Sequence, residues 1–161
     1  MITLVPMRAA QFEQFRQDAL DTFARDNVRA LRWSEDFALQ RARSAFESLL
    51  PCGLATPGHT LCEMHDESSA QTVGGLWYAL HEQVGPPSVY LYSIRVLPDH
   101  RGRGHATAAM ELLRRRAADL GAESISLHAF AVNTTAQALY RSLGYGITGF
   151  NMILRLDAGG H

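Results

Sequence analysis

The sequence has little of what marks a disulfide-rich, membrane-spanning or nucleic-acid-binding protein. Only two of its 161 residues are cysteines, Cys52 and Cys62, which is too few for a metal framework and favours unpaired thiols in a reducing compartment. The formal net charge is −1, so charge gives no reason to expect a nucleic-acid or membrane partner. No apolar run approaches the roughly 20 residues that span a bilayer, and no basic segment and signal-length apolar run follow Met1. We therefore expect a cytoplasmic protein.

The length and the apolar content fit one domain with one core. Apolar residues make up 47% of the chain, which is ordinary for a globular protein. The sequence has no internal repeat, low-complexity tract or interdomain linker. We expect a single domain over residues 1–157, followed by a frayed tail at residues 158–161.

Hydrophobic periodicity predicts a mixed order of helices and strands. Helices are expected at residues 9 to about 25, after a cap at Ser34 to about 50, at 106–120 with Gly121 at its end, and from Asn133 to Gly144. Strands are expected at residues 2–5, 60–65, 72–82, 89–97 and 124–131, with a last strand pair at 147–156 bent at Gly149. The order predicts a hairpin meander followed by a unit with a parallel strand pair.

These elements predict an α/β (α+β) fold. We expect a single mixed, twisted, mostly antiparallel sheet of six or seven strands with helices on both faces. Arg114, Arg115 and Arg116 are expected on a solvated helix face, or in contact with a phosphate or a partner. Trp33 and Trp77 are expected either in the core or in the wall of a pocket.

The loop before the 106–120 helix carries the strongest chemical signal. Gly102 and Gly104 allow a tight turn and a close approach of a ligand to the backbone. The free N–H groups of the first helical turn form an anion site at the positive end of the helix dipole. Arg101 and Arg103 add donors suited to phosphate oxygens. A phosphate site is the functional interpretation; the alternative is a plain turn with solvated arginines.

Two motifs resemble signatures of the GNAT superfamily of N-acetyltransferases. The stretch Arg101-Gly102-Arg103-Gly104-His105-Ala106 is similar to the family's Arg/Gln-x-x-Gly-x-Gly/Ala signature, and residues 94–98 look like its fourth strand. Residues 133–145 resemble its Asn-x-x-Ala-x-x-Leu-Tyr-x-x-x-Gly-Phe/Tyr helix. The resemblance covers residues 73–156 and implies a sheet split between strands four and five.

The resemblance implies roles for individual residues toward acetyl-coenzyme A. The pyrophosphate is expected on the backbone amides of Arg101, Gly102, Arg103, Gly104, His105 and Ala106. The pantetheine arm is expected to enter the split beside the backbone of Ile94 and Val96, next to a bulge. Asn133 resembles the residue that hydrogen-bonds this arm, although it could serve only as a helix cap. Tyr140 resembles the catalytic tyrosine near the thioester sulfur, although its place on an apolar stripe also suits a core aromatic.

The chemistry expected from the resemblance is acyl transfer to an amine. The amine must be neutral to attack, and a backbone N–H, expected at Val96, could stabilise the oxyanion. Tyr140 is the candidate acid for the departing thiolate. The base stays open, because Ser93 stands where many relatives carry a carboxylate. Candidates for that role are His81, His128 and a water relay from Glu63, Glu82 or a backbone carbonyl.

We therefore expect an N-acetyltransferase that moves an acetyl group directly from acetyl-CoA to a primary amine of a small molecule or a peptide N-terminus. A protein lysine or a polyamine is the runner-up acceptor. The competing hypothesis is a non-catalytic acyl-CoA-binding regulatory module. Acetyl-CoA serves as co-substrate, no metal is expected, and the family resemblance adds a homodimer to the expected partners.

Overall fold

The computed structural model describes residues 1–156. Its elements, in chain order, are β1 (Ile2–Pro6), α1 (Ala9–Arg29), α2 (Glu35–Leu49), the 3-10 turn η1 (Gly53–Ala55), β2 (His59–Asp66), β3 (Gln71–His81), β4 (Ser88–Val96), the 3-10 turn η2 (Pro98–His100), α3 (His105–Asp119), β5 (Ser124–Leu127) and α4 (Thr134–Ser142). The expected tail at residues 158–161 and residue 157 lie outside the described residues.

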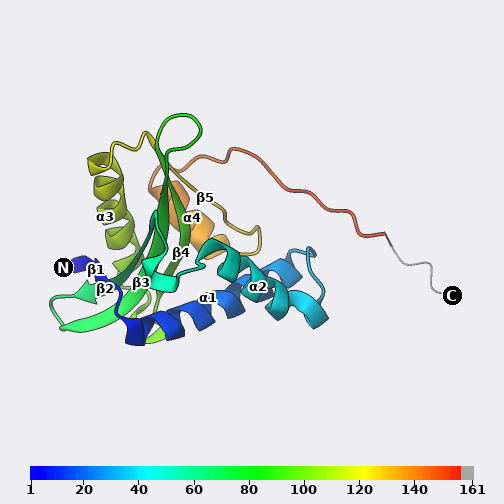
Figure 1. Ribbon diagram of the computed structural model, residues 1–161, viewed down its shortest axis with the longest axis horizontal. Helices are drawn as coiled ribbons and strands as arrows, with labels where there is room; N and C mark the ends of the chain where they lie inside the picture. Colours follow the sequence, from blue (N-terminus) through cyan, green and yellow to red (C-terminus); the bar gives the residue numbers. More distant parts are fainter. Residues whose placement is uncertain (157–161) are drawn as a thin grey trace.

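The strands form one mixed sheet in the order β1-β2-β3-β4-β5. The first four strands are antiparallel neighbours, and only β4 and β5 run parallel. This arrangement confirms the mostly antiparallel sheet with one parallel pair, because the connection from β4 to β5 passes through α3 (Figure 1). The sheet of the described residues has five strands, so the prediction of six or seven strands was wrong.

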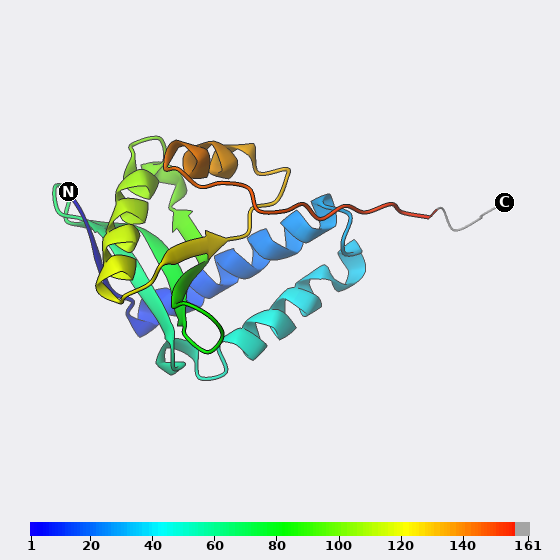
Figure 2. The ribbon, with the colours of Figure 1, turned by 90° about the horizontal axis from the view of Figure 1, so that it is seen from above.

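The strands that the sequence predicted but the structure does not form are those at residues 147–156. Their alternating apolar pattern is that of a strand, but they pair with none of the described strands. They run as extended chain from the end of α4 away from the body of the molecule, as Figures 1 and 2 show in orange and red. A strand forms only where another strand accepts its hydrogen bonds, and none does so here.

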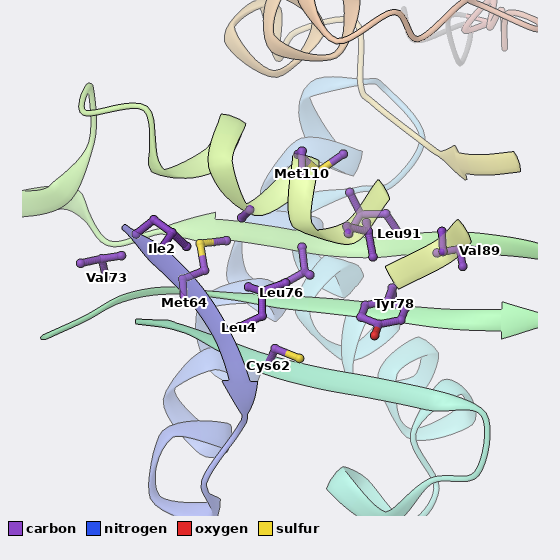
Figure 3. Close-up of a cluster of buried hydrophobic side chains, with 13 residues drawn as sticks. Ile2, Leu4, Cys62, Met64, Val73, Leu76, Tyr78, Val89, Leu91 and Met110 are labelled. Carbon is purple, nitrogen blue, oxygen red and sulfur yellow. The ribbon is translucent and has the colours of Figure 1, made fainter. Parts of the chain in front are cut away.

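Helices cover both faces of the sheet, as expected. α3 lies on one face, and Leu76 and Met110 belong to the buried cluster between it and the sheet (Figure 3). α1 and α2 cover the other face, where Phe46 and Trp77 belong to a second cluster. Trp77 is therefore a core residue, with 1% of its surface exposed.

Some local expectations needed correction. Ser34 stands at the N-cap of α2, but its side chain makes no capping hydrogen bond. Arg116 does not lie on a solvated face, because its guanidinium donates to the carbonyl of Leu4 at 2.6 Å and to Cys62 Sγ at 3.2 Å. These bonds fasten α3 to β1 and β2.

A pair of glycines in β3 lets two neighbours come close to the sheet. A Cβ at Gly74 would overlap the carbonyl oxygen of Arg95 on β4, and a Cβ at Gly75 would lie 2.6 Å from the ring of Phe15 on α1. Only glycine leaves room for this packing. The two glycines thus let the C-terminal part of β4 and the ring of Phe15 on α1 each approach β3 closely.

Candidate functional site

The site begins where β4 and β5 part. Their parallel pairing starts at Ser88 with Ser124 and ends at Leu91 with Leu127, although β4 continues to Val96. The predicted split between the fourth and fifth strands is therefore present. Beyond Leu91, β4 presents one edge to a gap instead of a neighbouring strand.

A β-bulge in β4 marks the start of this gap. Tyr78 of β3 pairs with Leu91 and Trp77 pairs with Ser93, so Tyr92 is the extra residue between them. Such a bulge bends its strand and increases the local twist. The bulge was expected in this region and turns β4 away from β5.

The backbone of Ile94 and Val96 faces the gap. The N–H of Leu97 donates to the carbonyl of Val73 on β3 at 2.8 Å. Because successive residues of an antiparallel strand point their N–H and C=O groups to opposite sides, those of Val96 and Ile94 point away from β3. The carbonyl of Val96 accepts from Arg101 Nε at 3.0 Å. The gap-facing N–H groups are free to pair with an extended ligand.

The loop after β4 ends at an uncapped helix terminus. Gly102 and Gly104 have φ angles of +73° and +79°, and a Cβ on either would meet no atom within 4 Å. Gly104 is the N-cap of α3, with no side-chain cap and no acidic residue in the first turn. The helical bonds begin with Ala108 N–H to the carbonyl of Gly104 at 3.0 Å. The amides of His105, Ala106 and Thr107 therefore lack helical acceptors.

This terminus fits a diphosphate. Exposed amides at the positive end of a helix bind anions, and the open space over both glycines lets phosphate oxygens approach the backbone. Arg101 and Arg103 are exposed beside it. The 3-10 turn η2, which sequence reasoning did not anticipate, turns the chain from β4 toward this loop.

Asn133 caps α4, as its alternative interpretation allowed. Its Oδ1 accepts from the N–H of Ala136 at 3.1 Å. Capping occupies the carbonyl oxygen only, which leaves the amide Nδ2 as a donor for another partner. The two interpretations of Asn133 are therefore compatible in this geometry.

Tyr140 is half-buried on α4 and packs against the core on the α3 side of the sheet. Burial, with a smaller contribution from the charge of Tyr145, raises the pKa of Tyr140 to about 12. The two rings lie 5.7 Å apart. The Tyr140 phenol consequently keeps its proton throughout the physiological range, as a proton donor must.

The four candidate bases lie in different places. Glu63 is buried on β2, with β3 between it and β4. Burial alone would raise the pKa of Glu63, but hydrogen bonds from Arg8 and Thr72 lower it. Arg8 donates to this carboxylate from Nε at 2.9 Å and from Nη2 at 3.1 Å, and the Thr72 hydroxyl donates at 2.9 Å. This carboxylate is thus held in a structural ion pair. Glu82 is exposed just beyond the end of β3.

The two histidine candidates lie at the ends of β3 and β5. His81 ends β3, and its Nε2 is 3.4 Å from the hydroxyl of Tyr92, the bulge residue. His128 directly follows β5, with its ring 4.7 Å from that of Phe130. Partial burial, and to a lesser degree the charge of Arg32, lowers the pKa of His128.

A cluster of aromatic side chains beside the bulge was not predicted from the sequence. Tyr92 stacks on Trp77 with ring centroids 4.6 Å apart, and Tyr90 meets Tyr92 edge-on at 4.7 Å. Trp77 Nε1–H donates to His59 Nδ1 at 3.0 Å, so that nitrogen of His59 carries no proton. The alternating tyrosines Tyr90 and Tyr92 of β4 were the only sign of this group in the sequence. The contact with His59 could not be predicted, because His59 lies on β2, far away in the sequence.

Residues 1–156 contain one large hollow outside this site, but neither a metal cluster nor a membrane-spanning helix. A surface hollow of about 650 Å³, lined in part by Arg8, Glu63 and His100, lies beside the start of α1. No group of three or more His, Cys, Asp or Glu side chains in the described chain could hold a metal. No helix among these residues is both long and apolar enough to cross a membrane.

Comparison with known proteins gives a consistent family match. The model of the acetyltransferase (GNAT) family matches residues 16–145. Two relatives from Bacillus subtilis strain 168 are uncharacterized N-acetyltransferases. YdgE is 35% identical over 153 residues, which cover 93% of this chain and 95% of YdgE. YycN is 30% identical over 155 residues, which cover 96% of this chain and 99% of YycN.

Solved structures show the same fold. The crystal structure of YycN superimposes with a TM-score of 0.91 over 97% of this chain and 99% of that one. The structure of AAC(6')-Iy in complex with a CoA-S-monomethyl-acetylneamine bisubstrate analogue has a TM-score of 0.60 at 19% identity, over 97% and 98% of the two chains. The latter likeness concerns the fold alone.

Proposed function

Since this chain belongs to the acetyltransferase (GNAT) family and is an acyltransferase, we propose that it moves the acetyl group of acetyl-CoA directly to a primary amine of a small molecule or a peptide N-terminus. The observation that carries the proposal is the uncapped start of α3 next to the gap that opens after Leu91 and Leu127. An anion site beside an unpaired strand edge suits a ligand that has a diphosphate joined to an extended arm.

The chain's own groups would hold acetyl-CoA at three points. The amides of residues 101–106 receive the pyrophosphate, with Arg101 and Arg103 beside them. The gap-facing backbone of Ile94 and Val96 pairs with the pantetheine arm in the manner of an added strand. Asn133 Nδ2 donates to a carbonyl of that arm while Oδ1 keeps its cap on α4.

Acetyl-CoA, when bound, supplies an activated acyl thioester. Tyr140 holds a proton on its Oη that passes to the departing sulfur, because burial keeps this phenol protonated. The N–H of Val96 points into the gap and would stabilise negative charge on the acyl oxygen. Bringing the amine and the acyl group together in the gap would supply much of the rate enhancement.

The proton of the acceptor amine needs a second group. His81 and His128 suit this role better than Glu63, because Glu63 is held by Arg8 and Thr72. The hydroxyl of Tyr92 contacts His81 and stands at the bulge. A water relay that carries the amine's proton to one of these imidazoles would let the amine enter the gap as a cation and react as a neutral nucleophile.

A second candidate function rests on Ser93. This residue pairs with Trp77 where a carboxylate base would be expected, and a chain without a base would serve as an acyl-CoA-binding regulatory module. The two functions differ in turnover. A binding module would bind CoA tightly and release no thiol with any acceptor.

Thiol release from acetyl-CoA across a panel of small amines, peptides and polyamines tests the proposal. The chain contains no lysine, so side-chain amine acetylation found by mass spectrometry belongs to the acceptor. The exposed Cys52 would react with thiol reagents, and a Cys52→Ser background removes that signal. Acceptor-dependent release supports the transferase; tight binding without release for the whole panel supports the module.

A further inference from the structure

Two aromatic side chains follow the last pair of β4 and β5, one on each side of the gap. Leu91 and Leu127 form that pair, and both pack in the cluster on the α3 side of the sheet. Tyr92 and His128 are the next residues on the two chains. Neighbouring residues of a strand point to opposite faces, and Tyr92 indeed packs with the cluster on the α1 and α2 side. The ring contacts of His128 lead to the same side.

A row of six rings joins these two side chains across the α1 and α2 face. Each ring centroid lies within 6.3 Å of the next, in the order Tyr92, Trp77, Phe46, Phe23, Phe130 and His128. We call these residues the aromatic row. Its two central members on β3 and α2 are buried, whereas the other four rings keep part of their surface exposed. Aromatic surface is thus present on both sides of the gap.

The groups proposed to hold acetyl-CoA belong to the other side of the sheet. The phosphate site is the start of α3, and Tyr140 packs with the cluster on the α3 side. With the thioester sulfur near Tyr140, the α1 and α2 side of the gap is left for the acceptor amine. This step rests on the proposed function, and it brings the acceptor to the aromatic row.

Two arginines limit the charge that such an acceptor can carry. Arg41 lies over Trp33 with its guanidinium carbon 5.8 Å from the ring centroid, and Trp33 meets Phe23 edge-on at 5.2 Å. Arg32 is close enough to His128 for its charge to lower the pKa of that imidazole. Aromatic faces attract cations, but a cation of this chain already occupies the face of Trp33. A second positive charge on the ligand would be repelled by Arg32 and Arg41.

We propose that the acceptor is a monoamine whose primary amino group is joined by a short chain to an aromatic ring. The ring would pack against the exposed parts of Tyr92 and Phe130, because aromatic pairs gain more than the area that they bury. The neutral nitrogen then bonds to the acyl carbon, the carbon–sulfur bond breaks, the nitrogen loses a proton and the thiolate gains one. Polyamines are poor acceptors in this arrangement, since their further ammonium groups meet the arginines.

Three amines test this substrate class by their kcat/KM with acetyl-CoA. Phenethylamine has the ring, 2-cyclohexylethylamine has a saturated ring of similar size, and spermidine has three amino groups. Phenethylamine is expected to exceed 2-cyclohexylethylamine by about 5-fold and spermidine by at least about 50-fold. Equal values for the aromatic and the saturated amine, or a higher value for spermidine, would overturn the proposal and leave the transferase standing.

Removal of single rings tests the row itself. Phe130→Leu and Tyr92→Leu each keep an apolar side chain without the ring, and both are expected to lower the ratio of the phenethylamine to the 2-cyclohexylethylamine kcat/KM toward 1. Phe12→Leu is the matched control, because the Phe12 ring lies against Gly53 and outside the row. A general loss of structure would lower both values and keep their ratio. An unchanged ratio in both row variants would overturn the proposal.

Binding separates this inference from the proposed function. Calorimetry with saturating CoA measures phenethylamine and spermidine without any turnover, and phenethylamine is expected to bind at least about 10-fold more tightly. If no amine releases thiol from acetyl-CoA, the transferase fails, yet this order of affinities would still support a site for an aromatic amine. Weaker binding of phenethylamine than of spermidine, or no binding of phenethylamine, would overturn that site as well.

Discussion

Leu91 and Leu127 form the last pair at which β4 and β5 lie side by side. After this pair β4 continues past the bulge at Tyr92, while the segment that follows β5 leaves the sheet toward α4. The unpaired edge of β4 then leads directly to the glycine loop and to α3. One local divergence of two strands thus leaves an unpaired strand edge that leads to the uncapped start of α3.

Gly104→Glu is predicted to abolish CoA binding. The new carboxylate would stand at the uncapped start of α3 and repel the diphosphate, and affinity should fall by at least about 100-fold. Gly104→Gln is the matched control, because it brings the same strain at a φ of +79° without the charge. Calorimetry with CoA measures both. Unchanged affinity in the Glu variant would remove the phosphate site from this loop.

Tyr140→Phe is predicted to lower kcat by about 100-fold with little change in the affinity for acetyl-CoA, as expected for the loss of a general acid. Tyr145→Phe is the control, since its ring lies 5.7 Å from that of Tyr140 on the same patch. Steady-state kinetics separate kcat from KM. If Tyr140→Phe turns over at the wild-type rate, the tyrosine is a core aromatic only.

The raised pKa of Tyr140 predicts the shape of the pH profile. The active form is the protonated phenol, and with a pKa of about 12 it persists at every pH below that value. Deprotonation of the acceptor amine should therefore make the rate rise or level off between about pH 7 and about pH 10. A falling limb in that range that disappears in Tyr140→Phe would show that the phenol ionises near its ordinary pKa.

Two substitutions separate the roles of Asn133. Asp keeps an acceptor for the N–H of Ala136 but has no donor for the pantetheine arm, whereas Ala loses both. Asn133→Asp should keep the unfolding free energy within about 0.5 kcal/mol and raise KM for acetyl-CoA about 5-fold. Asn133→Ala should raise KM similarly and also lose about 1 kcal/mol of stability. An unchanged KM in Asn133→Asp would leave the cap as the sole role.

Glu63→Gln is predicted to lower the free energy of unfolding by about 1–3 kcal/mol, because a buried carboxylate loses its charge-assisted bonds to Arg8. Glu13→Gln breaks an exposed pair with Arg16 and should have a much smaller effect on the free energy of unfolding, because solvent screens that pair.

The lowered pKa of Glu63 gives this prediction a pH dependence. The stabilisation is present above the unfolded pKa, about 4.3, and is lost as the pH falls through the folded value. The difference between the wild type and Glu63→Gln should therefore shrink in acid. Denaturant titrations at neutral and acidic pH measure it, and a constant difference would contradict the charged form of the pair.

Features that depend on neighbouring residues could be predicted from the sequence. The turn at Gly102 and Gly104 and the cap at Asn133 rest on residues within one turn of each other, and the structure has both. The one parallel pair followed from the helix between β4 and β5. These features need only local backbone geometry and short-range hydrogen bonds.

Features that depend on distant residues could not be predicted in the same way. The ion pair of Arg8 and Glu63 and the contact of Gly74 with Arg95 join separate elements. Residues 147–156 have the alternation of a strand, but alternation states only that one face is to be buried and not which chain buries it. The alternation led us to expect extra strands at residues 147–156, but these residues pair with none of the described strands.

The most direct measurement is a crystal structure of the protein with CoA bound. The account predicts the pyrophosphate within hydrogen-bonding distance of the amides at the start of α3, with the arm of the ligand beside the backbone of Ile94 and Val96. A ligand whose pyrophosphate lies in another part of the molecule, with side chains of the protein filling the first turn of α3, would contradict it.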